Sequence, residues 1–106
     1  MDQWIDGYLN HLRVERGLAP RTVRAYARDL AKLLDHAEQQ GVRDVRGLSP
    51  PVVSSYLVSL GKAGISARSA ARHLSSVRGF LRFLLRERVL RDDPSALVEA
   101  PRTGRR

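Results

Sequence analysis

The segment between Ser66 and Arg88 constrains the fold more than any other, because apolar residues recur in it at every third or fourth position. That spacing places them on one face of a helix, which Ser66 can cap at its N-terminus. The apolar face is made of Ala70, Leu74, Val77, Phe80, Leu81, Leu84 and Leu85. Because a face this broad must be covered by other parts of the chain, we expect this helix to be the longest and to form the centre of the fold.

Three further segments show the same helical period, over residues 4–17, 19–41 and 49–64. Each ends at a glycine, which suits the position after a helix. The second and third begin with proline, which suits the first helical turn, and Ser49 is a favourable cap for the third. The sustained two-residue alternation and the Asn-Gly or Asp-Gly turns that are typical of strands are missing. The sequence therefore predicts an all-α fold, a compact bundle of four main helices.

The end of the chain has a different composition. Pro94 could open a short fifth helix from Ser95 to Val98, whereas residues 101–106 hold three arginines and a glycine and nothing suited to a core. A chain of 106 residues is the size of one domain. We expect that domain over residues 1–100 and a linker over residues 101–106.

The chain is strongly basic, with a formal net charge of +8 and a pI near 11.2, which favours a polyanionic partner. This charge is local: residues 66–88 hold six Arg and one Glu, whereas residues 1–15 hold one Arg and three acids. The absence of cysteine excludes disulfides and cysteine zinc sites. Because there is no secretory signal pattern and no apolar run of about 18 residues, we expect a cytoplasmic protein without a membrane partner.

One narrow stripe on the helix after Ser66 carries much of this charge. Viewed down the helix axis, its members lie within about 40° on either side of Arg68, and they extend over about 27 Å along that axis. They are Arg68, Arg72, Ser75, Gly79, Arg82 and Arg86. Arginine can bind phosphate or guanine, serine can donate to phosphate, and a glycine allows close approach of the backbone. A solvated charged face is the alternative, but such faces usually mix signs and this stripe contains no acid, so we predict a duplex DNA surface.

The helix that begins at Pro20 carries a second stripe, clear of its apolar face, made of Arg21, Arg24, Arg28 and Lys32. Asp29 and Asp35 share this helix, so surface ion pairs are an alternative use of these cations. Thr22, in the first turn, either binds a phosphate or satisfies a backbone group. Two basic stripes in one small domain are nevertheless more typical of a nucleic-acid surface than of solvated faces.

Nothing in the sequence predicts catalysis, a metal site, a cofactor or a small-molecule substrate. The three histidines lack the i, i+4 spacing of a helical metal pair, and no Gly-rich phosphate loop follows a strand. His73 falls within the apolar arc of its helix, so we expect it in the core. Tyr8, Tyr26 and Tyr56 also lie on apolar faces, with the Tyr26 hydroxyl at the edge of its face.

Three segments resemble the core-binding domain of tyrosine recombinases. Residues 17–30, GLAPRTVRAYARDL, are similar to the second-helix signature of that family, in which a Thr, a Tyr and an Arg-Asp-Leu trio recur, although Ala19 stands where a Ser cap is common. Residues 68–84, RSAARHLSSVRGFLRFL, are similar to its fourth-helix signature. Residues 92–96, DDPSA, resemble the end of this domain in Xer-type members, the XerD-like ones above all.

The resemblance implies a SAM-like bundle that forms one half of a C-shaped clamp around duplex DNA, with the second and fourth helices facing the major groove. It also implies a full protein that works with other recombinase subunits, as a tetramer on DNA, in chromosome dimer resolution or integration at the bacterial nucleoid. Together, the two stripes and the resemblance predict DNA contacts by Arg21, Thr22, Arg24, Arg28, Lys32, Arg68, Arg72, Ser75, Arg82 and Arg86.

The family's catalytic residues, a tyrosine nucleophile with Arg and His or Lys helpers, belong to the domain that follows. This chain has no tyrosine after Tyr56, so the resemblance implies that it is no enzyme alone and that residues 101–106 begin the linker to an absent catalytic domain. Two other classes stay open: a free-standing helix-turn-helix regulator, and a helical module that binds RNA or another partner through phosphate alone. For Arg72 and Arg82 we expect a contribution to DNA binding and little to stability.

Overall fold

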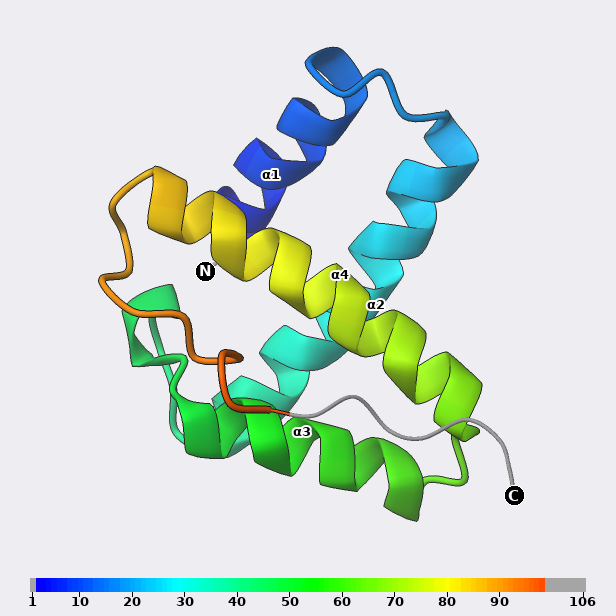
Figure 1. The fold of residues 1–106 in the computed structure, drawn as a ribbon, viewed down its shortest axis with the longest axis vertical. Coiled ribbons are helices and arrows are strands. Elements are labelled where there is room, and N and C mark those ends of the chain that lie inside the picture. Colours follow the sequence, from blue (N-terminus) through cyan, green and yellow to red (C-terminus); the bar gives the residue numbers. More distant parts are fainter. Residues whose placement is uncertain (1, 99–106) are drawn as a thin grey trace.

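The computed structural model describes residues 2–98, and within them the chain forms four α-helices, one short 3-10 helix and no strand (Figure 1). In chain order these are α1 (Asp2–Val14), α2 (Pro20–Gln39), η1 (Val45–Gly47), α3 (Pro50–Lys62) and α4 (Ala67–Arg86). The prediction of an all-α bundle of four main helices is confirmed. None of the described helices is long and apolar enough to cross a membrane.

The helix α4 lies at the centre, packed against α1, α2 and α3 (Figure 1). Its predicted apolar face is buried except for Leu85, which is half-buried at the edge. His73 also lies in the core, as predicted, and so do Tyr8 and Tyr56. Because α4 contacts every other α-helix, the outward side of α4 is held in a fixed place relative to α2.

The helix boundaries follow local signals at most ends. The glycines that close the first three helices, Gly17, Gly41 and Gly64, all have positive φ, a conformation that costs other residues about 1 kcal/mol or more. The Ser66 hydroxyl accepts a hydrogen bond from the Ser69 amide at 3.1 Å, so the predicted cap of α4 is confirmed. Ser49 precedes α3 as expected, but its side chain makes no capping hydrogen bond.

Two expectations for the C-terminal part were wrong. The helix α4 ends at Arg86, because Arg88 turns the chain with a φ of 62°. Residues 94–97 form a turn and no fifth helix, and the Asp93 carboxylate accepts hydrogen bonds from both the amide and the hydroxyl of Ser95. Arg78 of α4 donates to the carbonyls of Ser95 and Val98, which holds this turn against the bundle. The linker predicted over residues 101–106 lies outside the described residues, as do positions 1, 99 and 100 of the predicted domain.

Candidate nucleic-acid interface

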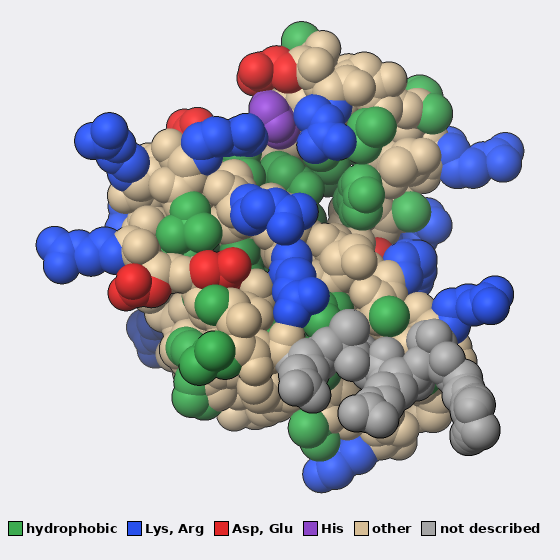
Figure 2. All heavy atoms as spheres, in the orientation of Figure 1, with side chains coloured by type: hydrophobic (Ala, Val, Ile, Leu, Met, Phe, Trp, Pro, Cys, Tyr) green, Lys and Arg blue, Asp and Glu red, His purple; other side chains and the backbone are tan. Residues whose placement is uncertain are grey.

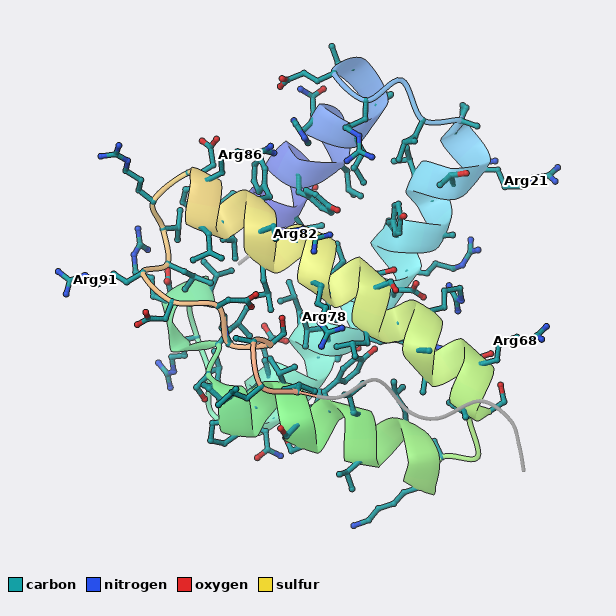
Figure 3. The ribbon with its side chains drawn as sticks, in the orientation of Figure 1. Arg21, Arg68, Arg78, Arg82, Arg86 and Arg91 are labelled. Carbon is teal, nitrogen blue, oxygen red and sulfur yellow. The ribbon has the colours of Figure 1, made fainter. Side chains whose placement is uncertain are left out.

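The ten residues predicted to contact DNA are all exposed, and all lie on α2 or α4. The two helices pack against each other, so the two stripes lie on neighbouring helices. Figure 2 shows Lys and Arg side chains around the rim of one face and a few at its middle over α4, with hydrophobic and some acidic side chains between them. In Figure 3, Arg82 lies on the middle of this face, whereas Arg21 and Arg68 project from its edge, at the starts of α2 and α4.

Four of the eleven acidic side chains lie together in another part of the surface. A separate groove between α1 and α2 is lined by these four, Asp2, Asp6, Asp35 and Glu38, and by no Lys or Arg. Asp35, which the sequence offered as an ion-pair partner for the α2 cations, lines this groove and also lines a second one beside Lys32, but the two side chains form no ion pair. Among residues 2–98, Arg72 is the one cation of the two stripes that forms an ion pair, so the other cations of α2 and α4 stay available for a polyanion.

Asp29 is the exception, because its side chain is only 4% exposed and faces α4. Arg72 donates through Nη1 to both carboxylate oxygens, at 3.0 and 2.7 Å. Ser76 donates its hydroxyl to Oδ2 at 2.8 Å. The surface ion pair suggested for Asp29 is therefore an inter-helix ion pair with a buried carboxylate, which anchors one member of the α4 stripe.

The anchor continues into the core through His73 and Tyr56. Nδ1 of His73 lies 3.4 Å from Asp29 Oδ1 and 3.2 Å from the Tyr56 hydroxyl, and that hydroxyl lies 3.4 Å from the main-chain oxygen of Asp29. Burial lowers the pKa of His73, an effect that the Asp29 charge opposes and the Arg72 charge reinforces. Burial likewise raises the pKa of Tyr56. Arg72 is thus linked to side chains of α2, α3 and α4, and we expect its contribution to stability to be larger than the sequence suggested.

Gly79, in the middle of the α4 stripe, lies beside the Tyr8 side chain of α1. A Cβ at this position would lie 2.4 Å from the Tyr8 hydroxyl oxygen of α1. The glycine is therefore needed for close packing of α1 on α4, and close approach of DNA to the helix backbone at this position stays a prediction.

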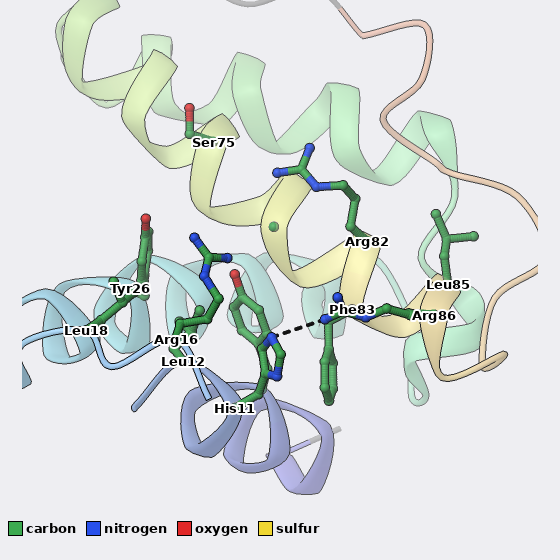
Figure 4. Close-up of a pocket in the computed structure, with 12 residues that line it drawn as sticks. His11, Leu12, Arg16, Leu18, Tyr26, Ser75, Arg82, Phe83, Leu85 and Arg86 are labelled. Atoms are coloured by element: carbon green, nitrogen blue, oxygen red, sulfur yellow. Dashed lines mark hydrogen bonds between the residues drawn. The ribbon is translucent and has the colours of Figure 1, made fainter. Parts of the chain in front are cut away.

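Arg86, at the end of the same stripe, also contacts α1. Its Nη2 lies 3.1 Å from Nε2 of His11, the contact drawn as a dashed line in Figure 4, and Nδ1 of His11 lies 3.2 Å from Glu15. Both contacts are satisfied by a neutral imidazole that donates from Nδ1 and accepts at Nε2. The second half of the α4 stripe therefore borders α1, whereas the first half borders α2.

Between these helices lies a hollow of about 430 Å³, which the sequence did not predict (Figure 4). Arg82 and Arg86 of α4 line it together with Arg16, which follows α1. Ser75 and the half-buried Tyr26, whose hydroxyl was expected at the edge, line it as well. The search for helical stripes could not find Arg16, because this residue lies in the connection between α1 and α2. Only the folded chain brings Arg16 close to the cations of α4.

Within residues 2–98, no three His, Asp or Glu side chains come together where a metal ion could bind. The chemistry that the described surface offers is hydrogen-bond donation from guanidinium, ammonium and hydroxyl groups to an anionic partner.

Residues 5–88 match the family model of the phage integrase N-terminal SAM-like domain. Among curated proteins, the tyrosine recombinase XerD of Bifidobacterium longum is 43% identical over 95 residues, which are 90% of this chain and 31% of that protein. The tyrosine recombinase XerC of Pseudomonas syringae is 40% identical over 106 residues, 100% of this chain and 36% of that protein. The XerD of Mycobacterium tuberculosis is 39% identical over 109 residues, 96% of this chain and 35% of that protein.

The chain thus spans about a third of the length of these relatives. Xer type is supported. The closer resemblance to XerD that the sequence suggested is not established, because the chain is 43% identical to one XerD and 40% identical to one XerC. No solved structure matches the chain. Since the family model covers most of the chain, this chain belongs to the phage integrase N-terminal SAM-like domains, and its relatives are Xer tyrosine recombinases.

Proposed function

We propose that this chain is the core-binding domain of a Xer-type tyrosine recombinase and binds duplex DNA through α2 and α4. The observation that carries the proposal is the separation of charge: exposed cations follow two adjacent helices, whereas four acids line a different groove. Phosphate contacts supply most of the affinity of such a surface, and arginines on a helix can add contacts to base edges. The ten residues of the two stripes are the proposed contacts.

In the full-length protein, this domain would form one half of a clamp around DNA, and other recombinase subunits would be its partners in a tetramer. Strand exchange for chromosome dimer resolution or integration, at the bacterial nucleoid in the cytoplasm, would be the activity of that larger protein. The proposal is limited to Xer type, because relatives named XerC and XerD are about equally similar to the chain. The cleavage chemistry would belong to the part of the relatives that this chain does not span.

The proposal is tested by fluorescence anisotropy with three labelled ligands of equal length: a duplex with a Xer recombination site, a random duplex and a structured RNA. We expect the tightest binding to the recombination site. We also expect the logarithm of the binding constant to fall linearly with the logarithm of the salt concentration, with a slope of about −0.9 for each phosphate contact. A salt slope near zero would contradict nucleic-acid binding, and equal affinity for the three ligands would contradict a recombinase domain.

Variants locate the surface. Replacing Arg28 and Arg68 together by glutamine removes one cation from each helix, and we expect weaker binding and a smaller salt slope. The matched control replaces Arg43 and Lys62, which are equally exposed but belong to the connection after α2 and to α3. Equal effects of the two pairs would show that only net charge matters and would contradict a specific role for α2 and α4.

A second experiment addresses a free-standing helix-turn-helix regulator. Such a protein usually reads DNA with a short second helix and binds two half-sites as a dimer. Here α4 is 20 residues long and forms the centre of the core. A chain that is already a stable dimer without DNA, as measured by analytical ultracentrifugation, would favour the regulator over the recombinase domain.

A further inference from the structure

The hollow between α1, α2 and α4 is open to solvent between the helices and is lined by donors from each of them (Figure 4). Arg16 approaches it from the connection after α1, and Arg82 and Arg86 approach it from α4. No carboxylate lines it. Three guanidinium groups around one concave site, without an acid among them, create a strong local preference for an anion.

These charges are not neutralised elsewhere in the described part of the chain. Arg16 and Arg82 make no ion pair or side-chain hydrogen bond within residues 2–98, and Arg86 contacts only the imidazole of His11. Glu15, the acid next to Arg16 in sequence, lies 3.2 Å from the other imidazole nitrogen of His11. In Figure 4, the head groups of Arg16 and Arg82 extend toward the hollow from different segments.

A second and independent observation concerns the Tyr8 hydroxyl. Tyr8 is only 6% exposed and lines the hollow, yet its hydroxyl makes no hydrogen bond within residues 2–98. An unsatisfied polar group at a nearly buried position costs free energy unless something outside the chain binds it. Burial raises the pKa of Tyr8, while the charges of Arg16, Arg82 and Arg86 oppose that shift, so the phenol remains a donor at neutral pH.

We propose that this hollow binds one phosphate group, held by Arg16 and Arg82 with the Tyr8 hydroxyl as a third donor. A phosphate diester carries one negative charge and oxygens that only accept hydrogen bonds, which matches a site lined by donors. Given the proposed function, the phosphate is one of the DNA backbone. The proposed DNA surface then includes α1 and the connection after it, in addition to α2 and α4. A phosphate bound in the hollow would fix the position of the DNA backbone relative to α4.

The test with DNA compares Arg16→Gln with Arg13→Gln, which removes the same charge three residues earlier, outside the hollow. For Arg16→Gln we expect duplex affinity to fall about tenfold, as for loss of one charged hydrogen bond, and the salt slope to fall by about one. Arg13→Gln should bind nearly as the unchanged chain does. Equal effects of the two variants would overturn the proposal.

Tyr8→Phe separates hydrogen bonding from charge. This variant keeps all cations, so we expect a several-fold loss of affinity with an unchanged salt slope. Thermal unfolding of the variant without DNA checks that the domain still folds, and Arg16→Gln, which alters an exposed side chain, supplies the same test independently of folding. Unchanged affinity of a folded Tyr8→Phe protein would exclude the phenol from the site.

A further experiment uses inorganic phosphate, with chloride at equal ionic strength as the reference. We expect phosphate to raise the unfolding temperature of the unchanged chain and to raise that of Arg16→Gln less. Stabilisation by phosphate without any binding of duplex would support the hollow and contradict the proposed function. Duplex binding that is indifferent to Arg16 and Tyr8 would support the proposed function and contradict the hollow.

Discussion

Replacing Arg72 by alanine tests whether one residue of the α4 stripe serves both the fold and the proposed DNA surface. The change leaves the Asp29 carboxylate, 4% exposed, with the Ser76 hydroxyl at 2.8 Å as its remaining close donor. Removing one partner of a fully buried ion pair costs about 3–5 kcal/mol, and loss of a charged hydrogen bond costs about 1.5–3 kcal/mol. Because the Arg72 side chain is itself 54% exposed, water can reach the vacated position and the lower range applies.

We therefore expect a loss of about 2 kcal/mol in the free energy of unfolding, which for a domain of this size lowers the unfolding temperature by roughly 8–16 °C. The measurement is urea denaturation followed by circular dichroism, with Arg82→Ala as the control. Arg82 is exposed and makes no ion pair within residues 2–98, so its replacement should change the stability by less than about 0.5 kcal/mol. This replaces the expectation that both arginines contribute little to stability.

A double-mutant cycle completes the test. In an Asp29→Asn background the buried charge is gone, so Arg72→Ala should cost much less, with a coupling free energy of about 1–2 kcal/mol. If Arg72→Ala and Arg82→Ala destabilise the domain equally, or if the cycle shows no coupling, the ion pair does not hold α2 against α4. The reasoning from the buried carboxylate would then be refuted.

Three further predictions concern the core behind the stripe. Gly79→Ala should destabilise the domain by about 1 kcal/mol, since overpacking against the Tyr8 hydroxyl outweighs the better helix propensity of alanine. In a Tyr8→Phe background, the same replacement should be neutral or stabilising. An equal cost in both backgrounds would contradict the contact. Burial lowers the pKa of His73 below its ordinary 6.5, so below that pH the unfolded chain binds a proton that the folded chain resists. The contribution of neutral His73 to the free energy of unfolding should therefore be complete above pH 6.5 and be lost as the pH falls below it. In denaturation experiments between pH 7.5 and 5.5, His73→Gln should show a shallower pH dependence than the unchanged chain. Leu81→Ala, at a position with no exposed surface, should cost roughly 2–5 kcal/mol by denaturation, and a smaller loss would show that the core collapses around the cavity.

The helices of this domain could be predicted because their signals are local. Apolar spacing defines each buried face, and the glycines at positive φ after the first three helices mark the ends. The end of α4 was missed because Arg88 takes the same left-handed conformation without being a glycine. Val89 and Leu90 then donate back to the Leu84 carbonyl and pack on the core, so the fold imposes a turn that the residue itself does not favour.

The end of the domain was mispredicted for a related reason. The sequence offered Pro94 as the first residue of a helix, which is a sound local signal. The chain instead forms a turn at residues 94–97, which is held by the Asp93 carboxylate and by Arg78 from the middle of α4. A contact between residues 17 positions apart leaves no periodic trace in the sequence.

The exposure of the two stripes was predicted correctly, but their internal differences were not. Periodicity assigns each residue to a face of its own helix and carries no information on the helix that packs beside it. The pairing of Asp29 with Arg72 joins residues 43 positions apart, and the contact of Tyr8 with Gly79 joins α1 to α4. Arg16 belongs to no helical face at all, so only the folded chain reveals its position.

These contacts divide the α4 stripe into two kinds of residue with different expected roles in DNA binding. Arg68 and Arg82 extend freely and bring a full charge, but ordering their long side chains on a ligand costs about 0.5–1.5 kcal/mol each. Arg72 is already ordered by Asp29, which removes most of that cost and also offsets part of its charge. The free arginines should therefore dominate the salt dependence, whereas Arg72, held in one orientation on α4, is the better placed of the three to distinguish one base edge from another.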